Sequence, residues 1–193
     1  MRRNRAHLFA LGLAIAATPA LAQEQLGTNP FSNGADGAKI HIASGYVCPA
    51  KIGEFERDAI GISDIDAGTD FCAYSALDGV YGTVKLTPLV GSYDPKTSLA
   101  SDFEEQEKTG GKQVDEKDVK VDDGKGAALT VFTRIYQTAT LEELHYFVEF
   151  TGAAVNGWAL EGTIEFASPR NDAQAKAFLD AIYSGAASRI AAK

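Results

Sequence analysis

The stretch from residue 127 to residue 167 constrains the fold most, because it predicts three consecutive strands of one antiparallel sheet. The runs 127–136, 144–151 and 158–167 are rich in β-branched and aromatic residues. Apolar and polar residues alternate along each run with a period of two, as in strands that bury one face. Only the short connections 137–143 and 152–157 separate the runs, so we expect neighbouring strands to run in opposite directions.

The alternation divides the side chains of these strands between two faces of the sheet. One face is expected to form an apolar wall of Leu129, Val131, Thr133, Ile135, Tyr146, Val148, Phe150, Trp158, Leu160, Ile164 and Phe166. The other face is expected to carry Arg134, His145, Glu149, Glu161 and Glu165, together with Phe132, Tyr136 and Phe147. Because three aromatic residues fall on this second face, we expect part of it to be covered as well.

Two helices are predicted around the strands. Asp94 followed by Pro95 is typical of a helix start, and Leu99 and Phe103 then follow at helical spacing until the glycines 110–111. A second helix is predicted after Asn171, with its apolar face formed by Ala175, Phe178, Leu179, Ile182 and Tyr183. The predicted fold class is therefore α+β, an antiparallel β-sheet with packed helices.

The N-terminal 22 residues resemble a secretory signal peptide. Three arginines precede an apolar stretch at 8–17, and Ala20-Leu21-Ala22 matches a small-x-small cleavage site. The apolar stretch is shorter than the roughly 20 residues that span a bilayer, so no membrane insertion is expected after cleavage. We expect residues 1–22 to be a signal peptide, 23–39 a flexible lead-in, and 40–193 a single domain in the periplasm or outside the cell.

The charge balance narrows the class of partner. The chain has 26 acidic and 18 basic residues and a net charge of −8. Nucleic acids and anionic membranes bind proteins through clustered lysine and arginine, so neither is an expected partner. A basic surface on another exported protein is the partner that this charge favours.

The chain contains two cysteines, Cys48 and Cys72. An even number of cysteines in an exported chain predicts one intramolecular disulfide bond. A cysteine nucleophile would need a free thiol, and a metal site would need more ligands than His41 and His145 supply. No metal and no cofactor is therefore expected.

Two acidic segments are candidates for partner binding. The first holds Asp64, Asp66 and Asp70; the second, within 112–125, holds Asp115, Glu116, Asp118, Asp122 and Asp123 between lysines. The first segment does not fit a calcium loop, since threonine stands at the sixth position and serine at the twelfth. We expect both to be solvated acidic loops, with an edge strand as the alternative for the second.

The sequence carries no motif of a common hydrolase or nucleotide-binding site. The serine-elbow, zinc-protease and phosphate-loop patterns are all missing. Glu161 and Glu165 lie about 13 Å apart along one strand, which is too wide for a glycosidase pair. An acid/base site that adds Glu149 or His145 from the neighbouring strand stays open as an alternative.

The order of elements resembles a known superfamily. A strand ending in TVKLTP (83–88), a helix of the type SLASDFEEQE (98–107), long antiparallel strands and a closing helix AKAFLDAIYSG (175–185) are similar to the Mog1/PsbP/DcrB-like α/β/α sandwich. The segments CPAKIGEFERD (48–58) and DFCAY (70–74) also resemble small bacterial secreted proteins of unknown role. The resemblance implies an α/β/α sandwich with accessory, partner-binding roles and no single conserved reaction, while the cysteine pair departs from the pattern of the superfamily.

Three functions are compatible with these features. The first is an exported non-catalytic accessory protein that binds a protein partner. The second is a periplasmic protein that binds a small ligand in a pocket between sheet and helix. The third is a hydrolase with an unrecognised site, which would cluster carboxylates or histidine with shifted pKa values.

The signal-peptide hypothesis makes a direct prediction about processing. When the full chain is expressed with an export system, the intact mass of the exported protein should correspond to a chain that starts at Gln23, with or without cyclisation of that glutamine. Mass spectrometry of the exported fraction measures this, and recovery of a chain that still contains residues 1–22 would refute export by cleavage.

Overall fold

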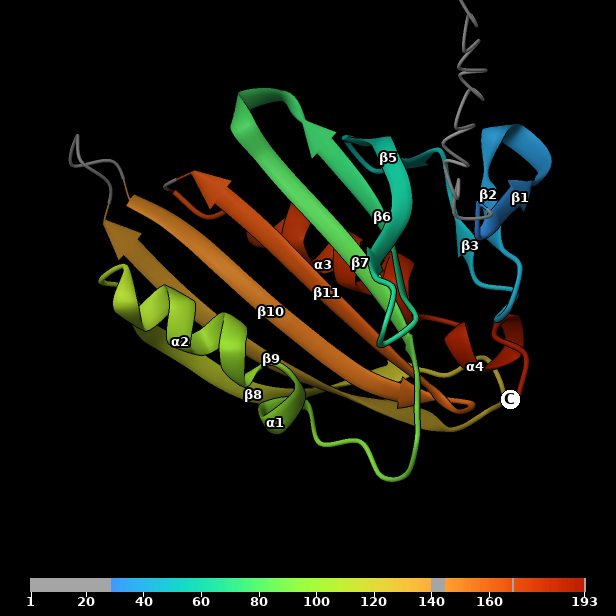
Figure 1. Ribbon diagram of the computed structural model, residues 1–193. Helices are drawn as coiled ribbons and strands as arrows, with labels where there is room; N and C mark the ends of the chain where they lie inside the picture. The colour runs from blue at the N-terminus through green and yellow to red at the C-terminus, as the bar shows by residue number, and fades with distance from the viewer. Residues whose placement is uncertain (1–28, 140–144, 168, 193) are drawn as a thin grey trace, which may run out of the picture.

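The computed structural model describes residues 29–139, 145–167 and 169–192, and shows a large antiparallel sheet with helices on both faces (Figure 1). The predicted signal peptide lies outside the described residues. The eight strands of the sheet are, in spatial order, β4 (Lys51–Ile52), β5 (Phe55–Asp64), β6 (Thr69–Ala76), β7 (Val80–Pro88), β11 (Trp158–Ala167), β10 (His145–Val155), β9 (Ala128–Ala139) and β8 (Lys112–Asp122). All neighbouring strands pair antiparallel. The sheet consists of two runs of sequential strands, β4–β7 and β8–β11, which meet where β7 pairs with β11.

The three predicted strands are confirmed as β9, β10 and β11, which are neighbours in the predicted order. Strand β10 extends to Val155, beyond the predicted end at residue 151. The turn to β11 therefore shrinks to Asn156 and Gly157, which both have positive φ angles, 51° and 84°. An Asn-Gly pair favours such a tight hairpin turn, and this local signal explains the longer strand.

The predicted division of side chains between faces is wrong for β10. Val148 lies opposite Tyr136 and Glu165, so Val148 and Phe150 share a face with Tyr136 rather than with Leu160. Alternation within a strand assigns its residues to two sets, but only the register with its neighbours decides which set faces which side. Glu149 and Glu161 therefore lie on opposite faces of the sheet.

Two short helices cover one face over β9 and β10: α1 (Pro95–Ser98) and α2 (Ala100–Lys108) (Figure 1). The Asp94 side chain caps α1 by accepting a hydrogen bond from the Lys96 amide, as the sequence predicted. Phe103 of α2 packs between Phe132, Tyr136 and Phe150 in a second, smaller core. The Arg134 guanidinium lies 3.9 Å from the centre of the Phe103 ring, which adds a cation–π contact to this layer.

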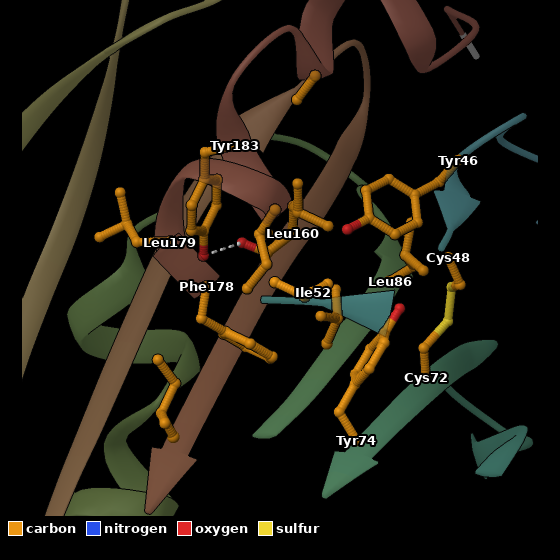
Figure 2. Close-up of a cluster of buried hydrophobic side chains, with 14 of the residues drawn as sticks. Tyr46, Cys48, Ile52, Cys72, Tyr74, Leu86, Leu160, Phe178, Leu179 and Tyr183 are labelled. Carbon is orange, nitrogen blue, oxygen red and sulfur yellow. Dashed lines mark hydrogen bonds between the residues drawn. A yellow bond between two sulfur atoms is a disulfide. The ribbon is translucent and has the colours of Figure 1, made fainter. Parts of the chain in front are cut away.

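The other face carries α3 (Asp172–Tyr183), followed by α4 (Ala186–Arg189). The buried face of α3 consists of the five residues that the sequence predicted. The Phe178 ring packs against that of Phe55, with ring centres 4.9 Å apart. It also meets the Tyr74 ring edge to face, with centres 5.8 Å apart (Figure 2). A side chain at Gly82 would place its Cβ 2.5 Å from the Phe178 ring, so the glycine lets α3 approach the sheet closely. No helix among the described residues is long and apolar enough to cross a membrane.

The folded chain starts earlier than the predicted boundary at residue 40. Strands β1 (Phe31–Asn33), β2 (Lys39–His41) and β3 (Val47–Cys48) form a small antiparallel sheet, with a short 3-10 turn η1 (Ala35–Gly37) after β1. Phe31, which the sequence placed in a flexible lead-in, is buried with its ring 5.4 Å from that of His41. A single apolar residue among turn-forming residues gave no periodicity from which to predict this strand.

A disulfide bond joins the small sheet to the large one. Cys48 of β3 and Cys72 of β6 are bonded, with their Cα atoms 6.4 Å apart (Figure 2). This separation falls within the range that a disulfide requires. The pair predicted from the cysteine count is therefore the covalent link between two sheets that share no strand pairing.

Phe178 provides a test of how α3 is held. Phe178→Ala should lower the free energy of unfolding by about 3–5 kcal/mol, because it empties a fully buried aromatic site between α3 and β7. Urea unfolding, monitored by tryptophan fluorescence, measures this change in the free energy of unfolding. Ile65→Ala, at a side chain that is 81% exposed, is the control and should change stability by less than about 0.5 kcal/mol. Similar stabilities for the two variants would contradict this packing.

Candidate functional site

An open groove lies at one end of the large sheet, on the side covered by α3. Its volume is about 840 Å³, within the roughly 300–1,000 Å³ that is usual for ligand pockets. Three connections surround it: the β4–β5 hairpin at Gly53 and Glu54, the 3-10 turn η2 (Leu77–Gly79) between β6 and β7, and the entry to α3 at Asn171. Strand ends and turns therefore build the site, and segments distant in sequence contribute to it.

The floor of the groove is apolar. Val80 at the start of β7 and Phe166 near the end of β11 are buried parts of the main core that also line the groove. Leu77 stands on the rim with 88% of its surface exposed. Leu77 therefore extends the apolar surface of the floor to the rim, and contiguous apolar surface of this kind is typical of an interaction site.

The rim of the groove is polar and only loosely paired. The Gln174 amide donates to Glu54 at 3.3 Å, and the Lys51 ammonium lies 3.4 Å from the Glu56 carboxylate. Both contacts are long and exposed, and pairs of this kind contribute little to stability. These side chains can therefore turn towards a ligand at low energetic cost.

A buried ion pair anchors the wall of the groove that leads into α3. Arg170 donates to Glu149 of β10 and to Asp172 of α3. Glu149 is 3% exposed, and a carboxylate this deep requires a paired cation. Glu149, considered from the sequence as a member of an acid/base site, instead fixes the connection between β11 and α3.

Glu161 occupies a separate buried position on the opposite face. It accepts hydrogen bonds from the Tyr93 hydroxyl at 3.0 Å and the Ser98 hydroxyl at 2.6 Å. Burial, reinforced by the nearby Glu161 carboxylate, raises the pKa of Tyr93, so this phenol stays neutral and remains a donor. Glu161 thus holds the segment before α2 on the sheet, and the acid/base pairing of Glu149 with Glu161 does not form. Glu165 is exposed, and the His145 side chain lies outside the described part of the chain.

The structure brings together a serine, a histidine and an aspartate that the sequence analysis did not connect. The His41 Nδ1 atom lies 2.6 Å from the Ser44 hydroxyl, and its Nε2 atom lies 2.8 Å from the Asp70 carboxylate. The order of the groups resembles that of a hydrolytic triad. Ser44 has no exposed surface and its oxygen also accepts a hydrogen bond from the Tyr46 amide, so it offers no approach to a substrate. The hydrogen-bonded relay Ser44–His41–Asp70 ties the small sheet to β6. The sequence analysis did not connect these residues, because no local motif links three positions spread over 41–70.

The first predicted acidic loop is only partly available. The Asp70 carboxylate is 14% exposed and bound to His41. Asp64 accepts hydrogen bonds from the amides of Asp66 and Ala67 and closes the β5–β6 turn. Within the described residues, no three histidine, cysteine, aspartate or glutamate side chains are placed to hold a metal ion.

The second acidic segment is mostly a strand and not a loop. Asp115, Glu116, Asp118 and Asp122 lie in β8, an edge strand of the sheet, and Asp123 lies in the turn after it. Alternating charged residues are a common protection of a sheet edge against further pairing, which explains the sequence pattern.

Lysine, arginine and backbone amide groups of the same chain balance much of the negative charge of this second acidic segment. Hydrogen bonds from Lys96, and then from Arg134, hold the pKa of Glu116 below its ordinary value. The ammonium of Lys117, 2.5 Å away, does the same for Asp115. Asp123 is capped by backbone amides of the next turn. Asp115, Glu116 and Asp123 therefore serve the chain itself more than an outside partner.

Three buried tyrosines predict that the protein loses stability at high pH. Burial raises the pKa of Tyr46, Tyr74 and Tyr183 above the ordinary value of 10.0. Above pH 10 the unfolded chain releases these protons while the folded chain keeps them, so the free energy of unfolding should fall by up to about 1.4 kcal/mol per pH unit for each tyrosine.

Tyr46→Phe isolates one of these contributions. The Tyr46 hydroxyl is buried and has no hydrogen-bond partner among the described residues, so the variant should be as stable as the parent at pH 7. Above pH 10 the variant should lose less stability than the parent, as measured by urea unfolding at several pH values. The same pH dependence for both proteins would argue against a raised pKa at Tyr46.

Comparison with known proteins gives no family for the chain: no protein-family model matches it, and no curated protein sequence matches it significantly. The site must therefore be interpreted from its own geometry.

Proposed function

We propose that this protein is an exported, non-catalytic accessory protein that binds a segment of a partner protein in the groove between the β4–β5 hairpin, η2 and α3. The observation that carries the proposal is the groove itself, which combines an apolar floor, loosely paired polar side chains and the exposed Leu77. Contiguous apolar surface rimmed by polar residues is typical of an interaction site.

The disulfide supports the exported location. Disulfides persist in oxidising compartments such as the periplasm or the extracellular space. The Cys48–Cys72 bond connects two sheets that are otherwise not paired, so it contributes to the structure and is not an isolated surface feature. Together with the signal-like residues at the N-terminus, it favours a periplasmic or secreted protein.

The layer arrangement supports the proposed relation to the Mog1/PsbP/DcrB-like sandwich. An antiparallel sheet lies between α1 and α2 on one face and α3 on the other (Figure 1). Membership of that superfamily implies accessory and partner-binding roles, in agreement with the proposed function.

A small-ligand-binding protein is the second candidate, because the groove volume suits a small molecule as well. The two candidates differ in what Leu77 does. A partner protein would cover this side chain, whereas a small molecule on the floor of the groove would leave it exposed.

Leu77→Arg tests the groove as a protein-binding surface. The exposed position tolerates arginine without loss of folding, but a charged side chain on the rim should oppose burial by a partner. Affinity capture from a periplasmic extract, with quantitative mass spectrometry, should recover a reproducible partner with the parent protein and at least tenfold less of it with the variant.

Ile65→Arg is the matched control, since Ile65 is similarly exposed in the turn between β5 and β6 and does not line the groove. It should capture as much partner as the parent. Equal capture by all three proteins would refute the groove as the partner site, and absence of any reproducible partner would refute the binding function.

A further inference from the structure

We infer that the partner segment bound in this groove is basic and apolar, with lysine or arginine side chains next to apolar ones. This inference rests on the proposed function and adds the chemistry of the occupant. Its support is the charge complementarity of the rim and the placement of apolar surface below it.

The rim carries an excess of negative charge. Glu54 and Glu56 line the groove with Lys51 as the basic residue beside them. Lys51 approaches Glu56 only to 3.4 Å. Among the described residues, the neutral amide of Gln174 is the one side chain that hydrogen-bonds to Glu54. Two carboxylates with one loosely placed cation attract a positively charged segment, and the net charge of −8 of the whole chain adds to this attraction.

Three other glutamates contrast with Glu54 and Glu56. Glu149, Glu161 and Glu116 are held by short hydrogen bonds to arginine, lysine, tyrosine or serine side chains. Those carboxylates have their charge or hydrogen-bonding capacity satisfied within the chain. At the groove, weakly engaged carboxylates adjoin a cavity, so charge and shape indicate the same site.

The apolar part of the occupant follows from the floor. Val80 and Phe166 offer apolar surface at the base of the groove, and Leu77 extends that surface to the rim. The Glu54 and Glu56 side chains lie on the hairpin at the other side. A segment with basic and apolar side chains can therefore satisfy both sides at once, whereas a purely basic segment would leave the floor unoccupied.

Three fluorescein-labelled octapeptides test the inference directly. In each one leucine alternates with a second residue, which is lysine in the first peptide, serine in the second and glutamate in the third. Fluorescence anisotropy with the protein should show the tightest binding for the lysine peptide and the weakest for the glutamate peptide. The preference for lysine should shrink as salt is raised, because screening weakens exposed charge pairs.

The double variant Glu54→Gln with Glu56→Gln removes the two negative charges from the rim and keeps the shape of the side chains. It should weaken binding of the lysine peptide by roughly three- to tenfold, the effect expected for two exposed charge pairs. Glu104→Gln with Glu105→Gln removes the same charge from exposed positions on α2, on the opposite face of the sheet, and should leave the affinity unchanged. Leu77→Arg should weaken binding of the lysine and serine peptides, because it removes apolar surface from the rim.

The outcomes separate this inference from the proposed function. If the serine peptide binds as tightly as the lysine peptide, or both double variants weaken binding equally, the basic character of the occupant is refuted. If no peptide binds while Leu77→Arg still abolishes capture of a partner, the inference fails and the proposed function stands. If capture does not depend on Leu77, the proposed function itself fails.

Discussion

The pairing of β7 with β11 is the contact on which the rest of the molecule depends. It joins two runs of sequential antiparallel strands, β4–β7 and β8–β11, into one eight-stranded sheet. Residues about seventy positions apart meet there, as in the pair Leu86 and Leu160. Helix α3 packs across this junction, because Gly82 of β7 and Gly162 of β11 leave no side chains under Phe178 and Ile182. A long-range pairing of this kind closes a large loop of chain, so the two halves gain their common core only when both are present.

The same junction positions the groove. Val80 and Phe166 come from the ends of β7 and β11 that face the entry to α3, and the β4–β5 hairpin closes the far side. The ion pair of Arg170 with the buried Glu149 then fixes the segment between β11 and α3. A rigid sheet with turns projecting from one end is a common way to present a recognition surface, because the turns are free to carry side chains that the core does not need.

The acidic residues fall into two groups: carboxylates that are hydrogen-bonded within the chain, and carboxylates that are exposed and able to contact a partner. Glu149, Glu161 and Glu116 satisfy hydrogen bonds within the chain, and Asp70 completes a relay with His41 and Ser44. Buried or ordered carboxylates of this kind stabilise connections between layers when their partners are present. Glu54 and Glu56 differ in being exposed and loosely paired next to apolar surface, and this difference, more than the total charge of the chain, selects the groove as the candidate site.

The sequence by itself determined the features that depend on neighbouring residues. Period-two alternation identified β9, β10 and β11, helical spacing identified the buried face of α3, Asp94 and Asn171 marked helix starts, and the cysteine count indicated the bond of Cys48 with Cys72. Only the tertiary structure decided which face of β10 meets α3, that Phe31 begins the fold, and that Ser44, His41 and Asp70 meet. The groove belongs to this second group, because it is built from three connections whose proximity arises from strand order and register. Local patterns record the preferences of a segment, whereas register and long-range pairing arise from contacts between segments that no local pattern contains.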